Sequence, residues 1–297
     1  VEVTQVTKGN WQVEWARWTA AGDQIIFSST EETPTERQFY SVSAESGEKM
    51  MLATGEKGMK VDPQMDDQNP QPTLIYNRSN WNRPDDLFAV KLCLRCREIY
   101  KPIQLTNTIP ANFASMKWNE PAFLSIPTRD GKKVPAKVYL PNGYSARSKQ
   151  KYPMVIFVHG AGYLQNIING WNNYYREFMF NEMLTQTGYV VLDIDYRGSA
   201  GYGRDWRTDV YDFLGGKDMD DHIDAIDYVV ANYAVNPAKV GVYGGSYGGF
   251  MAGMLITRAP DKVAAAAALR PVFDWKNYYA AKSGLHRPAP RLSRQKS

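Results

Sequence analysis

The chain has 297 residues, of which 43% are hydrophobic and 22% are charged, a balance typical of soluble globular proteins. The net charge is only +4 and the one dense basic stretch is the C-terminal tail, which argues against a nucleic-acid partner. No apolar run approaches the ~18 residues that would cross a membrane, and the length leaves room for about two domains.

The two ends and the cysteines say less about function. The first residue is Val1 rather than Met and no signal-peptide pattern follows, so we expect a fragment whose N-terminus is missing, and the compartment stays open. Cys93 and Cys96 form one C-x-x-C. Zinc would need two more ligands and a redox pair would need a βαβ context, so incidental thiols are favoured over a disulfide or a metal.

Residues 1–117 are rich in aromatic, β-branched and turn residues and show no helical period. The predicted strands are 18–27 (with a turn inside), 38–42, 49–52, 73–76, 86–90 and 102–106. The run from 73 repeats the earlier one, at a spacing near the ~40–50 residues of a four-stranded propeller blade. The pattern predicts the C-terminal part of a β-propeller, with a generic β-sandwich as the alternative.

After a predicted linker at 108–121 the pattern changes, and we expect a second domain at 118–297. A hairpin is predicted at 123–140 around a D-G turn, and strands then alternate with helices. Strands are expected at 152–158, 189–195, 240–243 and 263–269, and helices at 174–185, 220–232 and 251–256. This alternation predicts a mostly parallel sheet with helices on both faces and a ligand site at the carboxyl ends of the strands.

The sequence GGSYGG at 244–249 lies between a short apolar strand and a helix of small residues. This is the context of a G-x-S-x-G nucleophile elbow, in which a strained turn lifts the hydroxyl of Ser246 clear of the backbone. Side chains at Gly244 and Gly248 would collide with the neighbouring strand and helix. The backbone N–H of Tyr247 begins the helix and is placed to stabilise an oxyanion. A glycine-rich turn with a solvated serine is the alternative.

Three loop motifs occur in one order: VHGAGY at 158–163, DYRGSAGYG at 195–203 and GGSYGG at 244–249. Together they resemble the prolyl oligopeptidase family of serine peptidases, and ETPTER at 32–37 is similar to segments of its dipeptidyl peptidase IV branch. The resemblance covers roughly residues 1–280. It implies an α/β-hydrolase domain, incomplete here, preceded by the last blades of a β-propeller. It also implies short peptide substrates, often cut after proline or alanine, no cofactor, and a homodimer as one option for the full-length protein.

Carried over position by position, the resemblance assigns the nucleophile to Ser246 and one oxyanion donor to the N–H of Tyr247. His159 falls where relatives place the second oxyanion element, which is often a tyrosine. Either its ring or only the backbone of its loop would then help to stabilise the oxyanion. Three residues match the lining of the pocket for the side chain before the cut bond, with core packing as the alternative reading: Val272, Trp275 and Tyr279.

The mechanism also needs a base and an acid that orients it, which follow the nucleophile in this fold. Asp261 and Asp274 do not follow later strands, and His286 lies in a basic, proline-rich tail that resembles nothing in the family. His222 reads as a solvated histidine on the exposed side of an acidic helix. We therefore expect that the chain as given lacks the triad Asp and His and is inactive alone.

Three hypotheses remain: a serine peptidase acting through an acyl-enzyme on Ser246, an esterase or acyl hydrolase of the same fold, and an inactive truncated product or binding module. A propeller filters substrates by size and therefore favours peptides over esters. Acidic residues that would hold a substrate amine are not identified, since Glu31, Glu32 and Glu36 are candidates only by composition.

Overall fold

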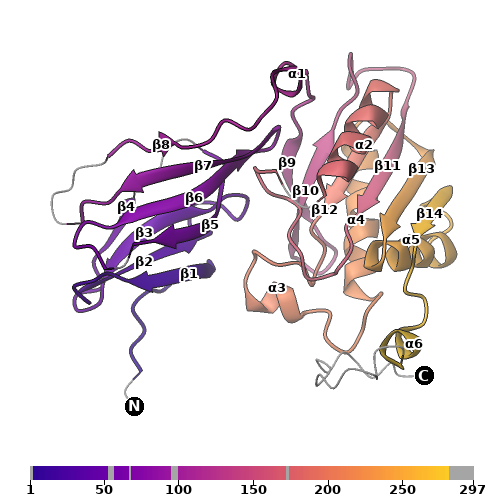
Figure 1. Ribbon diagram of the computed structural model, residues 1–297. Coiled ribbons are helices and arrows are strands. Elements are labelled where there is room, and N and C mark those ends of the chain that lie inside the picture. Colours follow the sequence, from indigo (N-terminus) through magenta and orange to yellow (C-terminus); the bar gives the residue numbers. More distant parts are fainter. Residues whose placement is uncertain (1–2, 53–56, 67, 95–99, 172–173, 281–297) are drawn as a thin grey trace. The chain divides into compact units, whose positions relative to one another are not determined.

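The computed structural model describes residues 3–52, 57–66, 68–94, 100–171 and 174–280, with only the backbone of 279 and 280 (Figure 1). The chain divides into two compact units. One unit comprises residues 1–118 with the short segments 168–173 and 201–203, and the other comprises the rest of the chain. Within the described residues no helix is long and apolar enough to cross a membrane.

The first unit holds two antiparallel sheets of four strands each, in the orders β1-β2-β3-β4 and β5-β6-β7-β8 (Figure 1). Consecutive strands pair in sequence order, as in propeller blades. The strands are β1 Val13–Trp18, β2 Gln24–Ser29, β3 Gln38–Ser43, β4 Lys49–Leu52, β5 Met59–Met65, β6 Thr73–Asn80, β7 Arg83–Lys91 and β8 Ile103–Gln104. The propeller-like reading of this region is confirmed, although strand β5 was not predicted.

Alternating side chains of these strands form an aromatic core, because successive residues of a strand point to opposite faces. Phe39, Tyr76 and Phe88 are buried, with ring centroids 5.4 and 6.1 Å apart along the row. In the ETPTER segment, buried Arg37 forms a two-point ion pair with Glu14 at 2.6 and 2.8 Å. Cys93 is disulfide-bonded, so the expectation of an incidental thiol is wrong there.

The second unit is built on a mixed six-stranded sheet in the order β14-β13-β11-β12-β10-β9 (Figure 1). The pairs β14–β13, β13–β11 and β11–β12 are parallel, whereas the predicted hairpin adds two antiparallel pairs at one edge. The strands are β9 Ala122–Pro127, β10 Lys133–Tyr139, β11 Tyr152–Val158, β12 Val190–Ile194, β13 Val235–Gly245 and β14 Ala265–Leu269.

Helices cover both faces of this sheet. The alternate residues Met154, Ile156 and Val158 of β11 belong to the core beneath α4 and α5, whereas Phe157 on the opposite face lies 5.4 Å from the ring of Tyr174 beside α2. The helices are α1 Ala111–Ala114, α2 Tyr175–Gln186, α3 Arg204–Thr208, α4 Lys217–Asn232, α5 Tyr247–Arg258 and α6 Trp275–Ala280. The predicted fold class is thus confirmed, and the short helices α1, α3 and α6 are additions to it.

Candidate active site

Ser246 lies at the apex of a sharp turn between the end of β13 and the start of α5. Its backbone has φ +57° and ψ −116°, a left-handed conformation that is strained for any residue with a side chain. Its N–H donates to Leu269 O at 3.0 Å, and its carbonyl accepts the Phe250 N–H at 2.9 Å. These bonds hold the strained residue between strand β14 and the first turn of α5, and its side chain remains half-buried.

The glycines of the elbow are required by close backbone contacts. A Cβ at Gly244 would lie 2.5 Å from Val158 O, and one at Gly248 would lie 2.1 Å from the same oxygen. A Cβ at Gly249 would come within 2.7 Å of Leu269 O. Real Cβ atoms do not approach backbone oxygens so closely, so only glycine lets α5 begin directly against the end of β11. The predicted reason for Gly244 and Gly248 is confirmed by these distances.

Tyr247 is the first residue of α5, so its N–H has no acceptor within the helix. Its ring is buried and its hydroxyl donates a short hydrogen bond to Asp218 Oδ2 on α4, an oxygen that also accepts the Gly215 N–H at 3.1 Å. Burial raises the pKa of the Asp218 carboxyl. The phenol therefore ties the residue that carries the expected oxyanion N–H to a second helix, and sequence reasoning did not identify Asp218.

Each of the three loop motifs contributes one ring to a stack beside the elbow. The ring of Tyr196 lies between the others, 4.4 Å from His159 and 5.7 Å from Tyr247, with interplanar angles of 16° and 8°. His159 is fully buried, and its Nδ1–H donates to Gly160 O at 2.9 Å while Nε2 lies 3.0 Å from Ser199 Oγ. The oxyanion role of His159 stays a prediction, and this geometry favours its loop over its ring.

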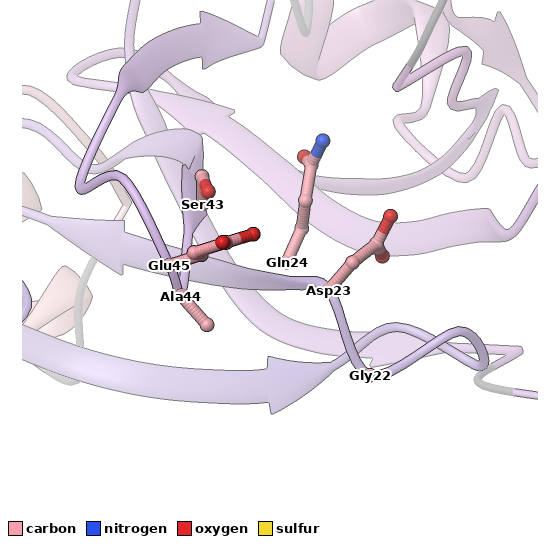
Figure 2. Close-up of a pocket in the computed structure, with 6 residues that line it drawn as sticks. All are labelled: Gly22, Asp23, Gln24, Ser43, Ala44 and Glu45. Atoms are coloured by element: carbon pink, nitrogen blue, oxygen red, sulfur yellow. The ribbon is translucent and has the colours of Figure 1, made fainter.

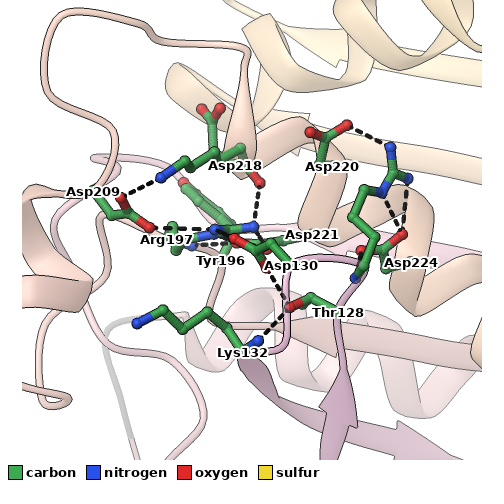
Figure 3. Close-up of polar contacts among 12 residues, drawn as sticks. Thr128, Asp130, Lys132, Tyr196, Arg197, Asp209, Asp218, Asp220, Asp221 and Asp224 are labelled. Atoms are coloured by element: carbon green, nitrogen blue, oxygen red, sulfur yellow. Dashed lines mark hydrogen bonds and ion pairs between the residues drawn. The ribbon is translucent and has the colours of Figure 1, made fainter.

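Arg197 follows Tyr196 and is the centre of a buried ion cluster (Figure 3). Its N–H donates to Asp221 Oδ2 at 2.7 Å, and its Nη2 and Nε donate to Asp221 Oδ1 at 2.7 and 3.0 Å. Its Nη1 contacts Asp130 of the D-G turn and, at 3.2 Å, Asp209. The hydrogen bond from Thr128, with that from Arg197, lowers the pKa of Asp130 to about 2. This cluster fixes the second glycine-rich loop to α4 and to the hairpin.

The prediction for His222 is wrong. The residue is fully buried; its Nδ1–H donates to Asp218 O at 2.7 Å and its ring lies 5.0 Å from that of Tyr196. Burial lowers the pKa of this imidazole to about 4. The buried residues of α4 are Asp218, Met219, Asp221, His222, Ala225, Ile226 and Val229. The polar residues at 218, 221 and 222 lie on the same side of the helix as Ala225, Ile226 and Val229, because they precede them by three, four or seven positions. This periodicity is the signal that the prediction of an exposed acidic helix overlooked.

The three residues matched to a substrate pocket follow β14. Val272 and Trp275 are half-buried, and the Trp275 ring lies 5.7 Å from Tyr247 and 5.5 Å from Phe250. Tyr279 lies in α6, but its side chain is outside the described residues, as is His286. Trp275 is therefore adjacent to the elbow helix, and the binding role of all three remains a prediction.

A half-open hollow on the first unit involves none of these residues. It is lined by Gly22, Asp23, Gln24, Ser43, Ala44 and Glu45, at the turns before β2 and after β3 (Figure 2). In the part of the chain that the structure describes, no group of three or more His, Cys, Asp or Glu side chains could hold a metal ion.

Comparison with known proteins agrees with this geometry. Residues 176–289 match the model of the prolyl oligopeptidase family, and residues 2–81 match that of the dipeptidyl peptidase IV N-terminal region. The crystal structure of Porphyromonas gingivalis dipeptidyl peptidase 4 superposes with a TM-score of 0.77 at 25% identity, covering 93% of this chain and 37% of that one. The fold of the second unit is thus that of an α/β hydrolase domain, which follows propeller blades in the sequence.

Two curated relatives illustrate the range of similar proteins. Dipeptidyl aminopeptidase BIII of Pseudoxanthomonas mexicana is 32% identical over 48% of this chain, and dipeptidyl peptidase 8 of Mus musculus is 25% identical over 93% of it. The chain covers 20% and 31% of their respective lengths. The chain therefore resembles the dipeptidyl peptidase IV-like branch of the prolyl oligopeptidase family of serine peptidases.

Proposed function

We propose that Ser246 attacks the carbonyl carbon of a peptide bond and forms an acyl-enzyme, so that the full-length protein releases short N-terminal peptides, with cleavage after proline or alanine. The observation that supports this most is the strained Ser246 at the start of α5, with φ +57°. Strain of this kind is retained where it serves function, and here it presents a hydroxyl beside a helix N-terminus. The names of the dipeptidyl peptidase relatives support the same substrate class.

In this proposal the N–H of Tyr247 stabilises the developing oxyanion, and Val272, Trp275 and Tyr279 line the pocket for the residue before the cut bond. The proximity of Trp275 to the Tyr247 ring supports that assignment. Both described histidines, His159 and His222, are fully buried and donate their Nδ1–H to backbone carbonyls. In this proposal neither of them is the general base, and we keep the expectation that residues 1–297 are inactive alone.

The test compares Ser246→Ala with Ser125→Ala, a matched change on exposed strand β9, in the full-length gene product. An Ala-Pro p-nitroanilide should be hydrolysed by the wild type and by Ser125→Ala, whereas Ser246→Ala should lose about 10⁴-fold or more because the nucleophile is gone. A fluorophosphonate probe should label only proteins that retain Ser246. Good turnover of a p-nitrophenyl ester without anilide cleavage would instead favour an esterase, and anilide cleavage by Ser246→Ala would refute the assignment.

A further inference from the structure

A buried carboxylate that the proposed mechanism does not use lies beside the first glycine-rich loop. Asp195 directly follows β12, and its side chain is fully buried. Its Oδ1 accepts the Asn166 N–H at 2.8 Å, and its Oδ2 accepts the Ile167 N–H at 3.0 Å. The two carboxylate oxygens therefore bind consecutive backbone N–H groups at the far end of the loop that begins after β11.

The same carboxylate also lies near the start of this loop. Its Oδ1 is 3.5 Å from Nε2 of His159, whose Nδ1–H donates to Gly160 O. Asp195 is itself fixed to the sheet, because its N–H donates to Pro135 O of β10 at 3.0 Å. One residue at the end of an inner strand thus meets both ends of the loop of residues 159–167.

Between those ends the loop passes directly beside the nucleophile turn. A Cβ built on Gly160 would lie 3.6 Å from Ser246 Cβ, and the Gly160 N–H donates to Tyr174 Oη at 2.8 Å. A Cβ built on Gly162 would lie 3.3 Å from the ring of Tyr247. The loop therefore packs closely against the turn, and a movement of the loop would change the space in which a substrate carbonyl approaches Ser246.

A carboxylate is suited to hold the end of this loop. Buried backbone N–H groups need acceptors, and a carboxylate accepts charge-assisted hydrogen bonds that are stronger than neutral ones. A side-chain amide has only one acceptor oxygen and would direct its own N–H groups at one of the two donors. Asp195→Asn should therefore release one of the two backbone N–H groups, although the side chain keeps its size.

A second buried carboxylate, two residues earlier, makes a different contact. Asp193 lies on β12 opposite Lys137 of β10, and its Oδ2 accepts from the side-chain Nδ2 of Asn166 at 2.5 Å. Burial raises the pKa of the Asp193 carboxyl, so an uncharged amide, which still offers one acceptor oxygen, is a mild substitute there. Asp193 is therefore a matched buried position that binds a side chain rather than the loop backbone.

We propose that Asp195 is a positioning residue for acylation: by binding the N–H groups of Asn166 and Ile167, it holds the loop of residues 159–167 against the nucleophile turn. It acts through the loop and not on the substrate itself. A displacement of about 1 Å near a reacting centre can cost about 10²-fold in rate. This inference rests on the proposed acylation of Ser246.

The test compares Asp195→Asn with Asp193→Asn in the full-length gene product. We expect Asp195→Asn to lose about 100-fold in kcat on the Ala-Pro anilide, with KM changed by less than about threefold. Asp193→Asn should keep kcat within about threefold of the wild type. Equal losses of kcat in the two variants, or wild-type kcat in Asp195→Asn, would overturn this inference alone.

The rate of labelling by a fluorophosphonate probe separates positioning of the serine from binding of the peptide. The probe reacts with the serine hydroxyl and has no peptide to bind, so Asp195→Asn should slow its reaction by about the same factor as kcat. Asp193→Asn should be labelled at the wild-type rate. An unchanged labelling rate in Asp195→Asn would overturn the inference. Absence of Ser246-dependent turnover in the wild type would overturn the proposed function and this inference with it.

A measurement on the wild type covers the case in which Asp195→Asn does not fold. In hydrogen–deuterium exchange, the amides of Asn166 and Ile167 should exchange as slowly as those of β12, because their acceptor is buried. Exchange at the rate of an open surface loop would overturn the inference. Circular dichroism and thermal unfolding check that the two variants are folded.

Discussion

At the residue scale, the elbow depends on glycines, because a Cβ atom at these positions would collide with neighbouring backbone. Gly244 and Gly248 both abut Val158 O, and Ser246 keeps a positive φ because its N–H and carbonyl are bonded on either side of the turn. A helix that begins against a strand end brings its N-terminal dipole close to the serine hydroxyl. The close contact between α5 and the end of β11 and the strained backbone of Ser246 therefore occur together.

Gly248→Ala should unfold or strongly destabilise the protein, because its Cβ would lie 2.1 Å from a backbone oxygen that cannot move independently. We expect a loss of about 3 kcal/mol or more in the free energy of unfolding, measured by urea denaturation. Gly253→Ala in the same helix is the control. The three atoms nearest to its Cβ belong to the exposed ring of Phe273, which can move, so the gain in helix propensity, about 1 kcal/mol, should offset the contact. Equal stability of the two variants would contradict this account.

Much of the local geometry of the elbow could be predicted from sequence. The glycine spacing around Ser246 identified the turn, because a motif bound by steric rules is local. Asp218 and Tyr174 could not be identified in that way. They lie 28 and 72 positions before Ser246 in the sequence, and only the packing of α4 and of β11 brings them to the elbow.

At the scale of elements, the second glycine-rich loop is held by buried charges as well as by the stacked ring of Tyr196. Arg197 is almost fully buried and bonds to carboxylates from α4, from the β9–β10 turn and from the segment after α3 (Figure 3). The D-G turn that sequence reasoning used only as a hairpin signal thus also supplies Asp130. Loop, helix and hairpin meet at one guanidinium.

Arg197→Met should destabilise the protein by about 3–5 kcal/mol, since it leaves the buried Asp221 carboxylate without its cationic partner. The double variant Arg197→Met/Asp221→Leu should lose less than Arg197→Met alone, because no unpaired buried charge then remains on α4. Arg129→Ala is the control: its pairs with Asp220 and Asp224 on the same helix involve a guanidinium that is 48% exposed, and its loss should cost less than about 1 kcal/mol. Urea denaturation measures all three, and a double variant no more stable than Arg197→Met would contradict the role of the unpaired charge.

At the scale of the whole molecule, buried titratable groups couple folding to pH. The His222 pKa, about 4 in the folded state, lies below its ordinary value of about 6.5. The unfolded chain therefore binds a proton between these values when the folded chain does not, and His222 contributes stability above pH 6.5 that is lost as the pH falls to 4. Glu182, whose pKa burial raises to about 7, acts in the opposite sense over much of the same window.

The variant His222→Asn keeps an N–H donor near Asp218 O but does not titrate. Between pH 7 and pH 4 the wild type should lose about 3 kcal/mol of unfolding free energy relative to this variant, because the other groups cancel in the comparison. Chemical denaturation at several pH values measures the difference. A difference that does not change with pH would mean that His222 titrates normally, as a solvated histidine would.

The sequence by itself determined the blades, the alternation of strands and helices, and the serine at its turn, because hydrophobic period and steric motifs act over a few residues. Only the tertiary structure decided which polar residues are buried. The acidic stretch from Asp218 to Asp224 reads as a solvated helix face, yet Asp218, Asp221 and His222 lie in the core. Their partners, Tyr247, Arg197 and Tyr196, come from other elements, and whether a buried charge finds a partner depends on contacts that no local pattern records.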